Sequence, residues 1–362
     1  MTTAKRHSLL VIPMLAALAV GWLLTSSSLS ACGGFFCTTS PVDQNAERII
    51  FTQNGDGTVS AYVQIEYTGE APDFSWILPL PEAIAAEDVE VPEDAMAAFT
   101  ELEVATDPVF LMPPWPQCLQ DRAARMAAAT TTIAAESAVQ VFASGEVGPY
   151  GFDVVGSEDP DALISWLRDN SYRVTEAMEP LIDLYVVEGF AFLAMKLRPD
   201  AGVQDVEPVK VTYPSEAPMI PLRLTAVAAN PDMAVMVWVY AQEQAVPANY
   251  AHETIANDEL VFFGFGATSN YRTLMGQKAD ENGGQAFITE YAGPATLLQV
   301  THPLLRDLGR QYPYVTRLNT VISPEEMTVD PVFSYDSSLA NVSNVRDLTQ
   351  MTGVYDCEPQ TA

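Results

Sequence analysis

Residues 59–67 constrain the fold more than any other segment, because apolar and polar side chains alternate there without interruption. This period of two predicts a β-strand with one buried face and one solvent-facing face. A turn sequence, Asn54-Gly55-Asp56-Gly57, precedes it, and a shorter apolar segment at 47–52 precedes the turn. Asn-Gly or Asp-Gly between two such segments is a strong hairpin signal. The chain therefore contains an antiparallel hairpin that needs a core on one side.

The rest of the chain has mostly short alternating segments, with helical segments between them in no regular βαβ order. The patterns predict strands at 74–78, 190–197, 207–213, 220–228, 233–241, 285–291 and 312–322. They predict helices at 93–105, from Pro160 to Asn170 with Asp159 as the cap, at 176–187 and near 270–280. Asn230-Pro231-Asp232 predicts a turn. The expected fold is α+β and mainly antiparallel.

Two short motifs occur twice in the same order. Tyr-x-x-Glu-Ala-Pro occupies 67–72 and 213–218, and Asp-Pro-Val-Phe occupies 107–110 and 330–333. Two similar β modules with helical insertions would explain both, as would chance in a chain rich in Ala, Glu and Pro. The expected organisation is a first β-rich module at 32–150, a second α+β module at 151–335 and a polar tail at 336–362. One continuous domain is the alternative.

The N-terminus has the three parts of a secretory signal peptide. Lys5 and Arg6 precede an uncharged apolar run, 9–24, and small polar residues follow it. The run is shorter than the about 20 residues that span a bilayer. Pro13 and Gly21 interrupt it, which disfavours an uncleaved anchor. We expect residues 1–31 to be removed and the remainder to be exported to the periplasm, the outer envelope or the medium. No later apolar run reaches membrane length.

The cleavage site has two interpretations. Ser28 and Ser30 suit a signal peptidase that releases a chain starting at Ala31. Residues 29–32 (Leu-Ser-Ala-Cys) also resemble a lipobox, in which Cys32 would be acylated and anchor the protein to a membrane.

Four cysteines are present: Cys32, Cys37, Cys118 and Cys357. An even number in an oxidising compartment favours two disulfides, and four cysteines permit three pairings. Their spacing does not match a zinc ribbon. Acylation of Cys32 would leave one thiol without a partner.

The chain is strongly acidic, with 47 Asp and Glu against 17 Lys and Arg. After the signal segment, the lysines are Lys196, Lys210 and Lys278. Such a charge repels phosphate backbones, so we expect no nucleic-acid partner. Divalent cations are an alternative partner, and solubility alone also explains the acidity.

No residue pattern predicts a catalytic site or a cofactor. His252 and His302 are the histidines outside the signal segment, and neither lies in a known motif. Residues 280–284 (Asp-Glu-Asn-Gly-Gly) contain oxygen ligands for calcium, but they lack the alternating order of a calcium loop and also suit a helix end. Glu290 is a candidate buried acid, although its strand pattern favours the solvent face.

Exposed tryptophans can form sugar-binding platforms. Trp76, Trp115, Trp166 and Trp238 lie in apolar segments or beside prolines, so core packing is the favoured interpretation.

The N-terminal block ACGGFFC…PVDQNAERIIF at 31–51 resembles the uncharacterised bacterial family known as domain of unknown function 2330. Further blocks of the resemblance lie at 62–81, 220–239, 283–294 and 323–333. The resemblance implies an exported bacterial protein with cysteines, and it supplies no catalytic residues.

Two classes of function remain. The first is a non-enzymatic envelope or extracellular protein that binds a partner, a glycan or a surface. The second is a secreted hydrolase with a carboxylate-based site, which would need two acids about 5–10 Å apart in a cleft.

Overall fold

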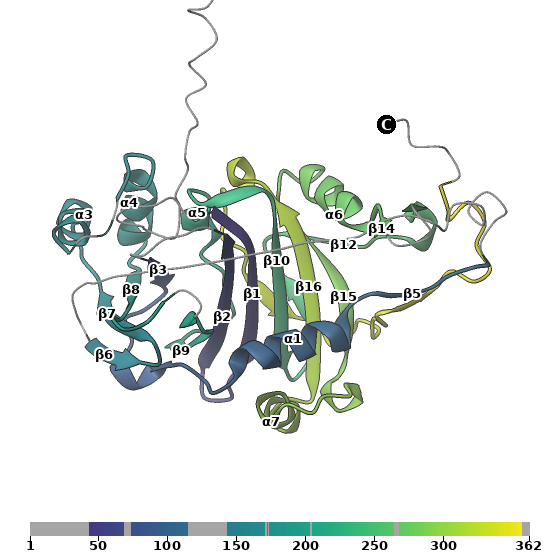
Figure 1. Ribbon diagram of the computed structural model, residues 1–362, viewed down its shortest axis with the longest axis horizontal. Helices are drawn as coiled ribbons and strands as arrows, with labels where there is room; N and C mark the ends of the chain where they lie inside the picture. Colours follow the sequence, from purple (N-terminus) through teal and green to yellow (C-terminus); the bar gives the residue numbers. More distant parts are fainter. Residues whose placement is uncertain are drawn as a thin grey trace, which may run out of the picture. The chain divides into compact units, whose positions relative to one another are not determined.

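The computed structural model describes residues 43–68, 74–114, 143–170, 172, 174–202, 205–263 and 268–356 (Figure 1). These residues all belong to one compact unit, 32–362. The predicted signal segment, the four cysteines Cys32, Cys37, Cys118 and Cys357, and Trp115 lie outside the described residues.

The predicted hairpin is confirmed. Strands β1 (Asp43–Gln53) and β2 (Thr58–Thr68) pair antiparallel, with Thr52 opposite Ser60. The turn between them includes Gly57 at φ +86°, a backbone conformation that favours glycine.

The hairpin lies within an eight-stranded sheet of order β12-β15-β16-β10-β1-β2-β9-β4. The further strands are β4 (Val89–Glu90), β9 (Val209–Pro214), β10 (Ala229–Ala241), β12 (Ala251–Glu253), β15 (Ala286–Pro294) and β16 (Tyr314–Ile322). The pairs β1–β10 and β12–β15 are parallel, and the others are antiparallel.

A second sheet has four antiparallel strands in the order β3-β8-β7-β6. They are β3 (Ser75–Leu80), β6 (Ala143–Val147), β7 (Tyr150–Val155) and β8 (Ala191–Leu197). In the described part of the chain, the remaining strands form three two-stranded ribbons: β5 (Val109–Leu111) with β18 (Val345–Asp347), β11 (Ala245–Pro247) with β17 (Phe333–Tyr335), and β13 (Phe262–Phe263) with β14 (Thr268–Ser269). The predicted α+β, mainly antiparallel class is therefore confirmed.

The sheets do not follow the predicted division at residue 150. The bond between residues 150 and 151 lies inside β7, and β1 and β2 pair with β10 and β9 from the second predicted module. The two Asp-Pro-Val-Phe motifs do share one property. Asp107 accepts a hydrogen bond from Arg317 (2.6 Å), and Asp330 accepts one from Arg223 (2.8 Å).

The two sheets face each other across the main core. The apolar side chains of β1, β2, β9 and β10 meet those of β3, β7 and β8 in one buried cluster that includes Phe51, Val211 and Met195. On its other face, the small sheet packs against α3 (Pro160–Asp169) and α4 (Glu179–Val187). The outer face of the large sheet is covered by α1 (Ala95–Thr106) and α7 (Pro303–Gln311), which Figure 1 shows beside β1 and β16.

Local sequence signals explain the position of α3. Asp159 caps α3 by accepting a hydrogen bond from the Asp161 amide (3.0 Å), with Pro160 at the first position, as predicted. Helix α6 (Tyr271–Asp280) also lies where predicted.

The segment 220–228 was predicted to be a strand, and this was wrong: it contains the short helix α5 (Leu222–Thr225). The predicted turn at 230–232 instead lies within the start of β10, where Asp232 has φ +57° and the pairing with β1 shifts register.

Helices also cover the face of β2 that was predicted to be wet, and that prediction was wrong. Ser60, Tyr62 and Gln64 are each 6 % exposed or less. Ile50 and Tyr62 pack with Phe99 and Leu102 of α1 and with Leu308 of α7. A polar side chain can therefore be buried here because the covering element comes from a distant part of the chain.

Candidate functional site

The two candidate histidines lie on different elements. His302 is at the N-terminus of α7, where Glu101 of α1 accepts hydrogen bonds from the amides of Thr301 (2.6 Å) and His302 (2.7 Å). His252 Nε2 is 2.7 Å from Thr289 Oγ1, and burial lowers the pKa of this imidazole. The two histidines therefore do not share a site, and each makes contacts within its own part of the fold.

The candidate calcium segment forms a helix end, as its alternative interpretation predicts. Helix α6 stops at Asp280, and the Gly284 amide donates to the Ala279 carbonyl (2.8 Å). Gly283 and Gly284 both have positive φ. Across the described ranges, no three His, Cys, Asp or Glu side chains form a group that could hold a metal ion.

Glu290 is buried, so the favoured solvent-facing interpretation was wrong. Its carboxylate accepts hydrogen bonds from Arg317 Nε (2.7 Å) and Asn319 Nδ2 (3.2 Å). Arg317, 2 % exposed, also donates to Asp107 and to Thr106 Oγ1 of α1. This network connects α1 to β15 and β16 and has a structural role.

The tryptophans that the structure describes do not form an exposed platform. Trp76 and Trp238 are buried, and Trp238 donates to Thr106 Oγ1 (2.9 Å). Trp166 is half-buried beside Tyr172.

A hollow of about 410 Å³ lies on the outer face of the large sheet, at the turn between β1 and β2. We call it the polar hollow, because most of its lining side chains bear hydroxyl, amide or charged groups. From the hairpin it is lined by Thr52, Asn54, Gly55, Asp56, Thr58, Ser60 and Tyr62. Lys210 and Thr212 of β9, and Leu308, Gln311 and Tyr312 at the end of α7, complete the lining.

Asn54 organises the lining of the polar hollow. Its Nδ2 donates to Thr58 Oγ1 (2.8 Å) and Ser60 Oγ (3.1 Å). Its Oδ1 accepts from Thr52 Oγ1 (2.9 Å) and from the Tyr312 hydroxyl. An amide has two N–H donors and an oxygen with two lone pairs, so these four bonds use its full capacity. Asn54 therefore orients the surrounding hydroxyl groups.

Tyr62 lies on the buried side of the polar hollow. Burial raises the pKa of its phenol to about 12, with further contributions from Glu90 and Tyr312. Among the residues that the structure describes, no hydrogen-bond partner is found for its hydroxyl group. Nearby, Lys210 forms an ion pair with Glu90. The site thus combines satisfied groups with one phenol that has unused hydrogen-bonding capacity.

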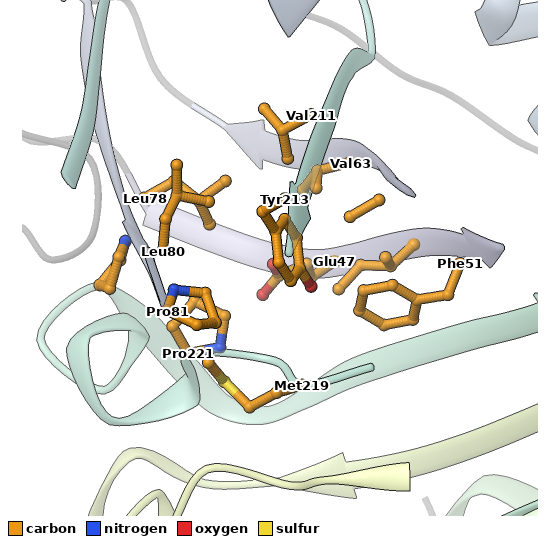
Figure 2. A pocket seen from close by; sticks show the side chains of 13 residues that line it. Glu47, Phe51, Val63, Leu78, Leu80, Pro81, Val211, Tyr213, Met219 and Pro221 are labelled. Atoms are coloured by element: carbon orange, nitrogen blue, oxygen red, sulfur yellow. The ribbon is translucent and has the colours of Figure 1, made fainter. Parts of the chain in front are cut away.

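A second pocket occupies the opposite face of the same strands. Figure 2 shows its lining, with Phe51, Tyr213 and Leu80 around an apolar space and Glu47 at its side. The cavity measures only about 20 Å³, close to the minimum for one water molecule. It is a packing defect between the sheets rather than room for a ligand.

A third hollow, of about 830 Å³, lies beside the end of α4. Its polar side chains are Ser157 and Glu158, and Ser157 already bonds to the backbone of Asp159. A ligand site usually combines concavity with several converging polar groups. Of these three hollows, the polar hollow meets that description best.

Sequence comparison agrees with the resemblance. The model of a family described as an uncharacterized protein conserved in bacteria, DUF2330, matches residues 26–334. The chain belongs to the DUF2330 family. All residues that line the polar hollow fall inside the matched DUF2330 region. No curated protein and no solved structure matches the chain.

Within the described part of this DUF2330 chain, no helix has both the length and the apolar character needed to cross a membrane.

Proposed function

We propose that this protein is an exported bacterial binding protein whose polar hollow holds a small, neutral, hydrogen-bonding molecule. The N-terminal pattern supports export: Lys5 and Arg6, the apolar run at 9–24 and the small residues after it. In that compartment the four cysteines would form two disulfides, or Cys32 would carry a lipid.

One observation supports ligand binding above the others. The polar hollow brings hydroxyl, amide and phenol groups from three distant segments, 52–62, 210–212 and 311–312, around a volume of about 410 Å³. That volume lies within the range of about 300–1,000 Å³ that is typical of small-molecule sites.

The hydrolase alternative fits this hollow less well. A carboxylate-based glycosidase needs two acids on either side of the bond that it cleaves, one with a raised pKa. Asp56 is the one carboxylate that lines the hollow. Hydrogen bonds from the side chain and the amide of Thr58 lower its pKa, which is the wrong direction for a general acid. The nearby Glu90 is paired with Lys210.

The binding proposal can be tested without knowing the ligand. A library of neutral, anionic and cationic small molecules is screened by NMR against the mature protein. We expect neutral polar molecules to shift the backbone amides of 52–62, 210–212 and 308–312. Asn54→Ala should abolish those shifts, because it removes four hydrogen bonds that orient the lining.

Asn282→Ala is the matched control, since Asn282 also precedes a glycine in a turn but bonds to Lys278 O and lies outside the hollow. If no molecule of any class shifts the hollow residues, the proposed function is wrong.

Export is tested by cell fractionation and N-terminal sequencing in the source bacterium. We expect a mature chain that starts at Ala31, or at Cys32 if it is lipidated, outside the cytosol. Globomycin, which blocks lipoprotein processing, distinguishes the two start sites. Recovery of the stable protein with its original Met1 from the cytosol would contradict the proposal.

A further inference from the structure

We infer that the ligand of the polar hollow is a neutral saccharide, held along one edge through its hydroxyl groups, with the Tyr62 hydroxyl as the principal donor. This inference rests on the binding function proposed above and specifies the chemical class of the ligand.

Charge disfavours ionic ligands. The chain has a formal net charge of −30, which repels anions. Inside the hollow, the ammonium group of Lys210 is paired with Glu90, and the carboxylate of Asp56 accepts hydrogen bonds from Thr58 Oγ1 (2.7 Å) and its amide (3.0 Å). The lining charges are thus already engaged, and a neutral ligand costs the least desolvation.

The lining also disfavours ligands that need a stacking surface. Tyr62 and Tyr312 are 6 % and 3 % exposed, so neither ring offers an open face for stacking. Nucleobases and other flat aromatic ligands bind by stacking on open aromatic faces. A saccharide edge needs hydrogen bonds instead.

The hydroxyl groups of the hollow match those of a sugar. A hydroxyl group, whether in the protein or in a sugar, can both donate and accept a hydrogen bond. A sugar hydroxyl can therefore replace a protein hydroxyl as a hydrogen-bond partner. Ser60 Oγ and Thr212 Oγ1 are 2.9 Å apart, and either one can act as the donor. A ligand hydroxyl can insert into this chain without leaving a buried polar group unsatisfied.

Tyr62 provides the independent observation that this array offers a ligand a free hydrogen-bonding group. It is more than nine-tenths buried, it lines the hollow, and its hydroxyl group has no bonding partner in the described part of the chain. The hydroxyl oxygen is not one of the fully buried polar atoms that lack a partner, so it opens into the hollow, and a sugar hydroxyl can take the place of the water that reaches it there. Asn54, whose capacity is filled, positions the neighbouring groups and would not contact the ligand through a free donor.

The test is calorimetric titration of the mature protein with glucose, N-acetylglucosamine and maltose, alongside adenosine, inorganic phosphate and putrescine. We expect at least one of the sugars to bind with a Kd of about 1 mM or tighter and the other three compounds not to bind. Tyr62→Phe keeps the ring and removes the hydroxyl group. It should weaken sugar binding by about 3- to 10-fold, the equivalent of one hydrogen bond.

Tyr172→Phe is the matched control. The Tyr172 hydroxyl likewise has no partner among the described residues, but it is fully buried, packs with α3 and lies away from the hollow. This variant should bind sugar as the parent protein does.

Two results would overturn the inference: binding of adenosine, phosphate or putrescine in the hollow while none of the sugars binds, or sugar binding that Tyr62→Phe does not weaken. The first result leaves the hollow as a ligand site, whereas the second means that the sugar does not bind through the Tyr62 hydroxyl. Failure of the NMR screen with every class of molecule would instead remove the proposed function itself.

Discussion

The two faces of each sheet differ in a consistent way. Where the sheets face each other, the buried side chains are mostly apolar, as in the pocket of Figure 2. Glu47, Thr316 and Thr320 are polar residues on this face of the large sheet. Where a sheet faces helices, it contains buried polar and charged groups. Examples are Gln64, Arg317 and Glu290 in the large sheet and Asp153 and Lys196 in the small sheet.

This difference assigns stability to the faces where the sheets meet and the proposed ligand binding to a face that helices cover. Two sheet faces that meet can bury long rows of alternating apolar side chains, which provides most of the hydrophobic stabilisation. A helix covers less of a sheet face than a second sheet does. Hydroxyl groups of the sheet that lie beyond the end of the helix can therefore remain open to a ligand. The polar hollow lies at such a place, between the β1–β2 turn and the end of α7.

The largest expected effect is on the buried arginine of the outer face. Arg317→Leu leaves Glu290 buried without its ion-pair partner and removes the bond to Asp107. We expect a loss of about 3–5 kcal/mol in the free energy of unfolding, measured by urea denaturation.

The double variant Arg317→Leu with Glu290→Leu sharpens the comparison. Replacing both charges by apolar groups is often neutral or stabilising, so much of the lost stability should return. If the double variant is as unstable as the single variant, the outer face depends on the hydrogen-bond geometry rather than on charge pairing.

Local patterns predicted the local elements of this fold. The hairpin at 54–57 was predictable because the turn chemistry and the alternation lie within a few residues. Helix α3 was predictable from its cap, Asp159, and from Pro160. Helix α7 was not predicted, although Pro303 at its first position is a valid start signal, because the segment is mostly polar and buries only Leu305 and Leu308.

The candidate site was not predictable from the sequence. The alternation predicts that Ser60 and Tyr62 lie on the solvent-facing side of a strand. Only tertiary packing brings Lys210, Thr212 and Tyr312 beside them. Glu290 was misassigned for a similar reason. Period-two alternation identifies the two faces of a strand but does not tell whether a helix covers the second one.

The smallest expected effect depends on pH and tests the helix-covered face of the small sheet. Asp153 of β7 lies under the α3–α4 layer, and burial raises the pKa of its carboxyl group from 3.8 to about 6, opposed by the charge of Lys196. Tyr172 is the other titratable group that interacts with it. A raised pKa means that the folded protein holds this proton more tightly than the unfolded chain does.

The stability that Asp153 contributes should therefore be complete below pH 3.8 and be lost as the pH rises through about 6. Asp153→Asn removes the charge that forms above this range. We expect the variant to match the parent protein at pH 4 and to be more stable at pH 7.5, by urea denaturation at both values. Asp183→Asn on the exposed side of α4 controls for the loss of one negative charge. An equal difference at both pH values would show that Asp153 is as well solvated as a surface acid, and that the contrast between the two faces of the small sheet does not extend to its charges.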